Sequence, residues 1–169
     1  MSGCGGVEGW FNNAVSEGAV APIEEYPDDV VAKVMSVNVK GVFLGMKHIA
    51  PVLRNRGGGA IVNTSSVAGL TGNAVISAYV ASKHAVIGLT RCGAQAYAAE
   101  GIRVNAVCPS PIDTRMMRSL EEGLRANMDD AEEPVDVVAA MQASIPAGRY
   151  GTPGEGAAVV AVLVSDRLF

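Results

Sequence analysis

Stretches with the apolar spacing of helices alternate with short, strand-like apolar runs along this chain. One such run ends at Trp10-Phe11-Asn12-Asn13. Pro27-Asp28-Asp29 then forms a helix-start signature, with proline early and acidic residues in the first turn. The helix predicted there extends to the glycines at 57–59, which lead into a strand at residues 59–65. Such alternation predicts βαβ units and a parallel sheet.

A second unit of strand and helix follows the first. A long helical pattern runs through Tyr79 to about Glu100, where Gly101 ends it. Residues 102–108 read as the next buried strand, which Pro109-Ser110-Pro111 breaks. A final helix is expected from about Gly154 to Leu163. The pattern therefore predicts an α/β fold.

An acidic stretch separates the last predicted strand from the final helix. Residues 113–136 hold eight acidic residues against three arginines, so the net charge of −4 belongs to this stretch. We expect the stretch to be solvated. It is also too long for a plain connection, which predicts that residues 115–136 form a substrate flap or a disordered insert. Met116 and Met117 are candidates for lining a substrate pocket, or for packing the flap itself.

Length and composition exclude several classes of function. A chain of 169 residues is long enough for one domain with a sizeable core, so residues 1–169 are expected to form a single domain. No basic patch with interleaved aromatic residues is present, which argues against a nucleic-acid partner. No apolar run reaches the ~20 residues of a membrane span, and no basic segment of a signal peptide precedes the first apolar run. We expect a cytoplasmic protein.

The cysteines and histidines give no indication of a metal site. Cys4, Cys92 and Cys108 are odd in number and not closely paired, which favours free thiols over a disulfide framework or a zinc site. His48 and His84 have no acidic residue or cysteine at ligand spacing. We therefore expect no metal.

Ser66, Tyr79 and Lys83 are the candidates for chemistry. Tyr79 and Lys83 are four residues apart in a predicted helix, so their side chains share one face. Ser66 stands at the end of a predicted strand, where open parallel sheets bind ligands. A cation about 5 Å from a phenol, at an effective dielectric of about 20, contributes roughly 3 kcal/mol and lowers the pKa of the phenol by about two units. The three residues predict proton-transfer chemistry.

With these residues placed, the chain from Trp10 onward resembles the short-chain dehydrogenase/reductase family. Six segments carry the resemblance, in the order of the family: Asn12-Asn13-Ala14; Asn38 within Val37-Asn38-Val39-Lys40-Gly41; Ile61-Val62-Asn63-Thr64-Ser65-Ser66; Tyr79-x-x-x-Lys83; Arg103-Val104-Asn105-Ala106-Val107-Cys108-Pro109 followed by Thr114; and Gly148-Arg149-Tyr150-Gly151-Thr152-Pro153. A lone Tyr-x-x-x-Lys is a weak signal, whereas several motifs at the spacing of the family are a strong one.

The resemblance implies hydride transfer between NAD or NADP and a carbonyl or alcohol of a small molecule. It implies that Tyr79 passes a proton to or from the substrate oxygen, that Ser66 hydrogen-bonds this oxygen, and that Lys83 lowers the pKa of the tyrosine and holds the nicotinamide ribose. Asn38, the fourth implied catalytic residue, anchors a water between the lysine and solvent. The implied cofactor contacts are Asn13, Ala14, Tyr79, Lys83, Pro109, Ile112 and Thr114.

Parts of the family pattern differ or are absent. Val15 and Ser110 stand where the family has glycine, and a positive φ at either position would be strained by about 1 kcal/mol. The cluster Gly3-Cys4-Gly5-Gly6-Val7-Glu8-Gly9 does not fit the glycine spacing of a diphosphate-binding loop. We expect a partial Rossmann-like, three-layer αβα fold that lacks the first βαβ units and the last strand. Weak dinucleotide binding, marginal stability and an exposed edge strand follow, and the choice between NAD and NADP is not readable.

Two readings of function remain. The first is an oxidoreductase; the second is a non-catalytic module that associates with other subunits through the helices carrying Asn38 and Tyr79, which the resemblance makes the expected surface of a homo-oligomer. A hydrolase with a serine nucleophile is poorly supported, because Ser66 does not stand in a Gly-x-Ser-x-Gly turn. No residue identifies the substrate.

Overall fold

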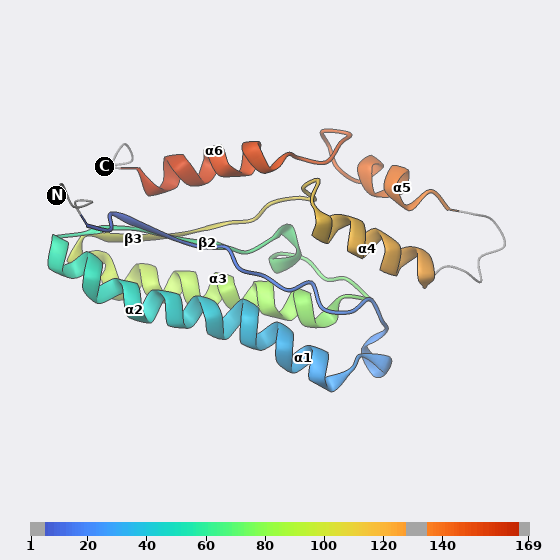
Figure 1. Ribbon diagram of the computed structural model, residues 1–169, viewed down its shortest axis with the longest axis horizontal. Coiled ribbons are helices and arrows are strands. Elements are labelled where there is room, and N and C mark those ends of the chain that lie inside the picture. The colour runs from blue at the N-terminus through green and yellow to red at the C-terminus, as the bar shows by residue number, and fades with distance from the viewer. Residues whose placement is uncertain (1–5, 128–134, 166–169) are drawn as a thin grey trace, which may run out of the picture.

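The computed structural model describes residues 6–127 and 135–165. Three parallel strands, β1 (Gly9–Asn12), β2 (Gly59–Thr64) and β3 (Ile102–Val107), form a sheet in the order β1-β2-β3. Figure 1 shows helices α2 (Gly41–Arg56) and α3 (Ser77–Tyr97) on one face of this sheet and α6 (Pro153–Val164) on the other. The predicted three-layer, partial Rossmann-like fold is confirmed.

The helix predicted to start near Asp28 is one rod with an irregular turn inside it. It consists of α1 (Asp28–Met35), the π-helical segment η2 (Ser36–Lys40) and α2. Within η2 the N–H of Gly41 donates to the carbonyl of Ser36, five residues back rather than four. The rod ends at Gly57, whose φ of 95° is the left-handed conformation that glycine adopts without strain.

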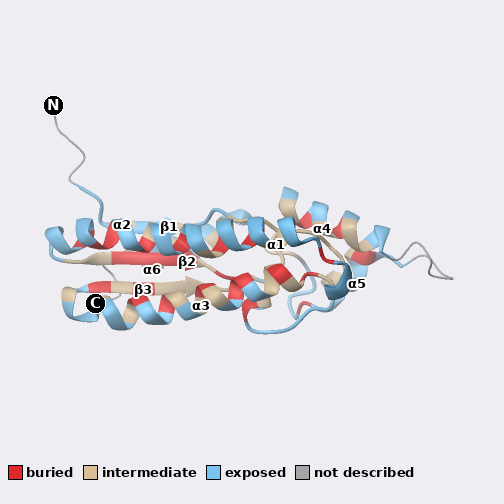
Figure 2. Ribbon diagram, turned by 90° about the horizontal axis from the view of Figure 1, so that it is seen from below, coloured by how far each residue is buried: buried red, intermediate tan, exposed pale blue. Residues whose placement is uncertain are grey.

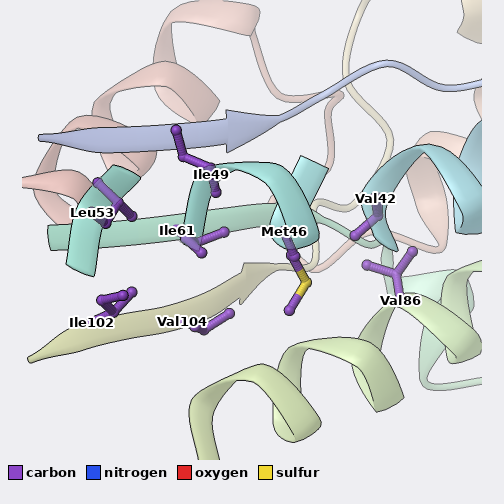
Figure 3. Close-up of a cluster of buried hydrophobic side chains, with 8 residues drawn as sticks. All are labelled: Val42, Met46, Ile49, Leu53, Ile61, Val86, Ile102 and Val104. Atoms are coloured by element: carbon purple, nitrogen blue, oxygen red, sulfur yellow. The ribbon is translucent and has the colours of Figure 1, made fainter. Parts of the chain in front are cut away.

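The main apolar core lies between the sheet and the α2–α3 layer. Its buried members come from α2, α3 and the strands β2 and β3, as Figure 3 shows: Val42, Met46, Ile49, Leu53, Ile61, Val86, Ile102 and Val104. The outer surfaces of α2 and α3 are largely exposed in the view of Figure 2. The sequence pattern of apolar residues in these elements is therefore explained by a single packed layer.

Apolar surface is left open elsewhere. β1 lies at the sheet edge, and its Trp10 and Phe11 are each 39% exposed. On α6, Val159 and Val162 are 54% and 53% exposed, although the helix packs on all three strands. The structure thus has the exposed edge strand that the sequence predicts.

The acidic stretch is more ordered than the sequence indicated. It contains α4 (Arg115–Ala126), and α5 (Val137–Ala143) begins directly after it, while the acidic residues at 129–133 lie outside the described residues. Met117 and Glu121 of α4 are buried, so the expectation of a wholly solvated stretch was wrong. Thr114 caps α4 by accepting a hydrogen bond from the N–H of Met117. This helix was not predicted from the sequence, because the many charged residues suggested a solvated segment.

Three short 3₁₀ segments complete the secondary structure: η1 (Ile23–Glu25), η3 (Val67–Gly69) and η4 (Ala98–Glu100). In the described part of the chain, only glycines have positive φ. Val15 and Ser110 are therefore free of the backbone strain considered for them. Across that same part of the chain, no helix combines the length and apolar character needed to cross a membrane.

Candidate active site

A cavity of about 630 Å³ opens beyond the C-terminal ends of the three strands. Figure 1 shows α4 and α5 at this same end of the sheet. The cavity wall contains seven of the nine residues for which the sequence predicted a catalytic or cofactor-binding role: Asn13, Ser66, Tyr79, Lys83, Pro109, Ile112 and Thr114. Asn38 and Ala14 are not part of the wall.

Lys83 is held inside the protein by α3. Its side chain is buried, and the Nζ donates a hydrogen bond to the carbonyl of Thr64 over 2.9 Å. The same Nζ lies 5.3 Å from the centroid of the Tyr79 ring. Burial penalises the ammonium and lowers the pKa of Lys83 to about 8, and the nearby Cys108 opposes this shift only in part.

Tyr79 stands one helical turn before Lys83 on α3. Burial raises the pKa of its phenol, a hydrogen bond with Ser66 acts in the opposite direction, and the charge of Glu17 raises the pKa further. The expectation that Lys83 leaves the phenol with a lowered pKa is therefore not met in the protein alone. The pairwise estimate omitted burial, which is the largest influence on this group.

Ser66 marks the end of the β2 segment, where extended backbone gives way to η3. Its Oγ accepts a hydrogen bond from the N–H of Ala68 over 3.1 Å, which orients the hydroxyl and leaves its proton available to another acceptor. The neighbouring Ser65 is buried and donates to the carbonyl of Lys83 over 2.9 Å. The bond of Ser65 ties the end of the β2 segment to α3, the helix that carries Tyr79.

Gly69 allows this close approach of η3 and α3. A Cβ at position 69 would lie only 2.8 Å from the carbonyl oxygen of Lys83. A larger residue would therefore push η3 away from the helix that carries the tyrosine and the lysine. The close packing explains why a glycine follows the catalytic serine candidate here.

Asn38 lies in the π-helical segment and is buried behind the cavity. Its Oδ1 accepts from the N–H of Ser16 over 2.8 Å, and its Nδ2 donates to the carbonyl of Ser16 and to the Oγ of Ser82, each over 2.9 Å. Ser82 in turn donates to the carbonyl of Tyr79 over 2.7 Å. The Asn38 amide therefore joins the loop after β1 to the helix carrying Tyr79, with both of its N–H donors used.

The other predicted cofactor contacts are positioned by loops that follow the strands. Asn13 accepts a hydrogen bond from the hydroxyl of Thr64 over 3.1 Å, and Pro109 accepts one from the N–H of Val67 over 3.0 Å. Ile112 forms an isolated bridge with Gly151. Ala14 is exposed and outside the cavity wall.

Sequence reasoning missed several residues of this site. Glu17, the Thr64 carbonyl that holds Lys83, and Met141 of α5 were not singled out. Glu17 follows the Asn-Asn-Ala motif by three residues, and that proximity was the available signal. The partner of Lys83 is a backbone group and leaves no trace in residue identities.

The described residues fit one end of a nicotinamide dinucleotide. An ammonium has three N–H donors, and Lys83 uses one of them on Thr64, so two remain for the hydroxyls of a ribose. In the described ranges, no strand leads through a glycine-rich turn into a helix, so these ranges offer no such cradle for a diphosphate. The same ranges contain no group of three or more His, Cys, Asp or Glu residues placed to hold a metal ion.

Comparisons with known proteins agree with this geometry. A family model described as enoyl-(acyl carrier protein) reductase matches residues 1–168. Levodione reductase of Leifsonia aquatica is 41% identical over 162 residues, which cover 96% of this chain and 59% of the relative. Cyclohexanol dehydrogenase of an Acinetobacter species is 42% identical over 156 residues, covering 92% of this chain and 56% of the relative.

Solved structures show the same fold. The crystal structure of levodione reductase has a TM-score of 0.87, with 96% of this chain and 61% of that chain covered. NAD⁺-bound xylitol dehydrogenase is 36% identical with a TM-score of 0.86, covering 96% and 64%. ElxO with NADP bound is 28% identical with a TM-score of 0.80, covering 95% and 60%. The chain thus spans roughly three fifths of the length of these proteins.

Proposed function

Because the chain belongs to the short-chain dehydrogenase/reductase family, we propose that the protein is an NAD(P)-dependent oxidoreductase that interconverts a small secondary alcohol and its ketone. The observation that carries the proposal is the single cavity that unites Ser66, Tyr79 and Lys83 at the C-terminal end of a parallel sheet. Open α/β sheets bind ligands at that end. The chain spans 59% of levodione reductase. The activity of a whole relative therefore applies to this chain only as a proposal.

Tyr79 is proposed to be the proton donor and acceptor. In reduction, its hydroxyl gives a proton to the carbonyl oxygen; in oxidation, its phenolate takes the proton of the alcohol. Ser66 is proposed to donate its hydroxyl proton in a hydrogen bond to the same oxygen, because its own Oγ is already oriented by the N–H of Ala68. Such a preorganised donor stabilises charge that develops on the oxygen.

Lys83 and the loop residues are proposed to hold the cofactor. A bound nicotinamide dinucleotide supplies or accepts the hydride. The two remaining N–H donors of Lys83 suit the ribose hydroxyls, and Asn13, Pro109, Ile112 and Thr114, which line the same cavity, are proposed to contact the cofactor. Ala14 and the water-anchoring role of Asn38 stay predictions. NAD and NADP remain alternatives, since one structural neighbour binds each.

The lining of the cavity supports a compact, apolar substrate. Met116, Met117 and Leu120 of α4 and Met141 of α5 contribute to the wall, together with the apolar side chains of Phe11, Val15, Val67 and Ile76. We therefore propose that residues 115–136 act as a substrate flap. One relative is named for cyclohexanol, and a cyclic secondary alcohol of that size suits the cavity.

Oxidation of cyclohexanol with NAD⁺ or NADP⁺, followed by the absorbance of the reduced cofactor, tests the proposal. Ser66→Ala and Tyr79→Phe are expected to lower kcat/KM by about 10²-fold or more, because each removes a group that acts on the substrate oxygen. Tyr97→Phe, on the same helix but outside the cavity wall, is the matched control and should leave kcat/KM unchanged. Equal rates for Tyr79→Phe and the wild type would refute the proposal.

A non-catalytic interaction module is the second candidate. On the outer side of α2, Phe43, Leu44 and Val52 are 51%, 37% and 46% exposed, which favours association through that helix. We propose a homo-oligomer formed by the helices carrying Asn38 and Tyr79. Sedimentation of the wild type and Phe43→Glu tests it: the charge is expected to dissociate the oligomer. A biological effect of the protein that is unchanged in Tyr79→Phe would favour the interaction module over the enzyme. The cytoplasmic location expected from the sequence stays a prediction.

A further inference from the structure

Glu17 places a carboxylate in the wall of the same cavity. It lies in the loop between β1 and η1, has no role in the reaction proposed above, and is partly buried. No hydrogen bond or ion pair of the described residues involves this carboxylate. Among those residues, it is also the only acidic side chain that lines the cavity.

The backbone on both sides of Glu17 is held firmly. Before it, the N–H and carbonyl of Ser16 are both bound by the Asn38 amide. After it, Gly18 has a φ of 82°, and a Cβ there would lie 2.9 Å from Val34. The N–H of Ala19 then donates to the hydroxyl of Tyr26 over 2.8 Å. Glu17 is thus fixed between two anchored positions rather than left on a free loop.

Glu17 also shares the cavity wall with Ser66 and Tyr79. The negative charge of Glu17 raises the pKa of the Tyr79 phenol, so the two groups interact electrostatically. The other charged side chain in this wall is that of Lys83, which uses one of its three N–H donors on the Thr64 carbonyl. A ligand that fills the cavity can therefore meet Tyr79 and Glu17 together.

A carboxylate in a largely apolar wall discriminates between substrates. An ionised carboxylate only accepts hydrogen bonds. An apolar ligand that displaces its water leaves it unsatisfied, which is unfavourable, whereas a ligand hydroxyl replaces the lost bond. A ligand that carries a carboxylate is repelled by the like charge of Glu17.

We propose that Glu17 determines substrate specificity by accepting a hydrogen bond from a second hydroxyl group, so that the preferred substrates are cyclic diols and hydroxyketones and alcohols bearing a carboxylate are rejected. The inference rests on the proposed function in taking an alcohol as the substrate. It adds a substrate class and a residue that recognises it.

Binding of cyclohexanol, the 1,2-, 1,3- and 1,4-cyclohexanediols and 4-hydroxycyclohexanecarboxylate, measured by ligand-detected NMR, tests the inference without requiring turnover. In the wild type, at least one diol is expected to bind about tenfold more tightly than cyclohexanol. Glu17→Leu is expected to bring that ratio to within about threefold of one. Glu17→Gln, which keeps an acceptor and removes the charge, is expected to bind the carboxylate while retaining part of the diol preference.

Glu24→Gln is the matched control, because Glu24 is an exposed acid on η1 outside the cavity wall. It should leave all ratios as in the wild type. A diol preference that persists in Glu17→Leu, an absence of any preference in the wild type, or no detectable binding of any of these alcohols would overturn the inference. If Glu17-dependent binding is found but no alcohol is oxidised with either cofactor, the inference stands and the proposed function fails.

Discussion

Replacing Lys83 by methionine is expected to make the stability of the protein less dependent on pH. The lysine is buried, and its pKa is lowered from 10.5 to about 8 by that burial. Methionine has a similar length and carries no charge. The variant therefore removes the burial penalty together with the hydrogen bond to the Thr64 carbonyl.

The sign of the effect follows from the direction of the pKa shift. Because the folded-state pKa of Lys83 lies below the unfolded value, the penalty is present in full below about pH 8 and fades as the pH rises towards 10.5. A shift from 10.5 to about 8 corresponds to about 3 kcal/mol at neutral pH. Between pH 7 and pH 10, the wild type should gain about 2.5 kcal/mol relative to Lys83→Met.

Urea unfolding followed by circular dichroism at pH 7, 8, 9 and 10 measures this difference. At pH 7, the loss of the hydrogen bond offsets part of the relief, so Lys83→Met should be as stable as the wild type or more stable by about 1–2 kcal/mol. Lys47→Met, an exposed lysine on α2, is the control and should differ from the wild type by a constant amount. A stability difference between Lys83→Met and the wild type that does not change with pH would refute the reasoning.

Three other changes probe the site. Asn38→Ala should lower the free energy of unfolding by about 3 kcal/mol, because it leaves the N–H and carbonyl of Ser16 without partners. Urea titration measures this loss, and a loss below about 1 kcal/mol would contradict the prediction. Gly69→Ala should destabilise the protein by about 1–3 kcal/mol, because the added Cβ would contact the carbonyl of Lys83. Gly88→Ala, where an added Cβ has no neighbour within 4 Å, should instead stabilise α3 by about 0.5–1 kcal/mol. Equal thermal unfolding temperatures for the two variants would be inconsistent with this packing. Glu17→Gln should lower the pKa of Tyr79, since the charge that raises it is removed; ultraviolet titration of tyrosinate, with Tyr79→Phe subtracted, reads this directly, and an unchanged midpoint would argue against it.

The residues that the sequence singled out for chemistry lie together in the structure because their arrangement is local. Tyr79 and Lys83 need only a helix to share a face, and Ser66 needs only the end of a strand. The strands were placed for a similar reason: apolar runs bounded by glycine and proline are short-range signals. The cavity of the structure contains these residues where the pattern predicted them.

Properties that depend on burial or on distant partners were beyond the sequence. The pKa of Tyr79 is governed first by burial, which a pairwise estimate from residue spacing cannot include. Asn38 is hydrogen-bonded to Ser16, which is 22 residues away in the sequence, and no residue near either position indicates this contact. The buried Glu121 in α4 was obscured because a run of charges usually indicates a solvated surface.

The π-helical turn at Ser36–Lys40 makes the number of residues in this rod a structural constraint. An α-helix advances by about 100° per residue, so one residue more or fewer turns everything beyond it by that angle. Deleting a single residue from 36–40 would give a regular helix, yet Val34 and the core residue Met46 could no longer both face inward. We therefore expect this turn to accept substitutions at the exposed Ser36 and Lys40 but no deletion, because the chain length here encodes the alignment of two packed faces.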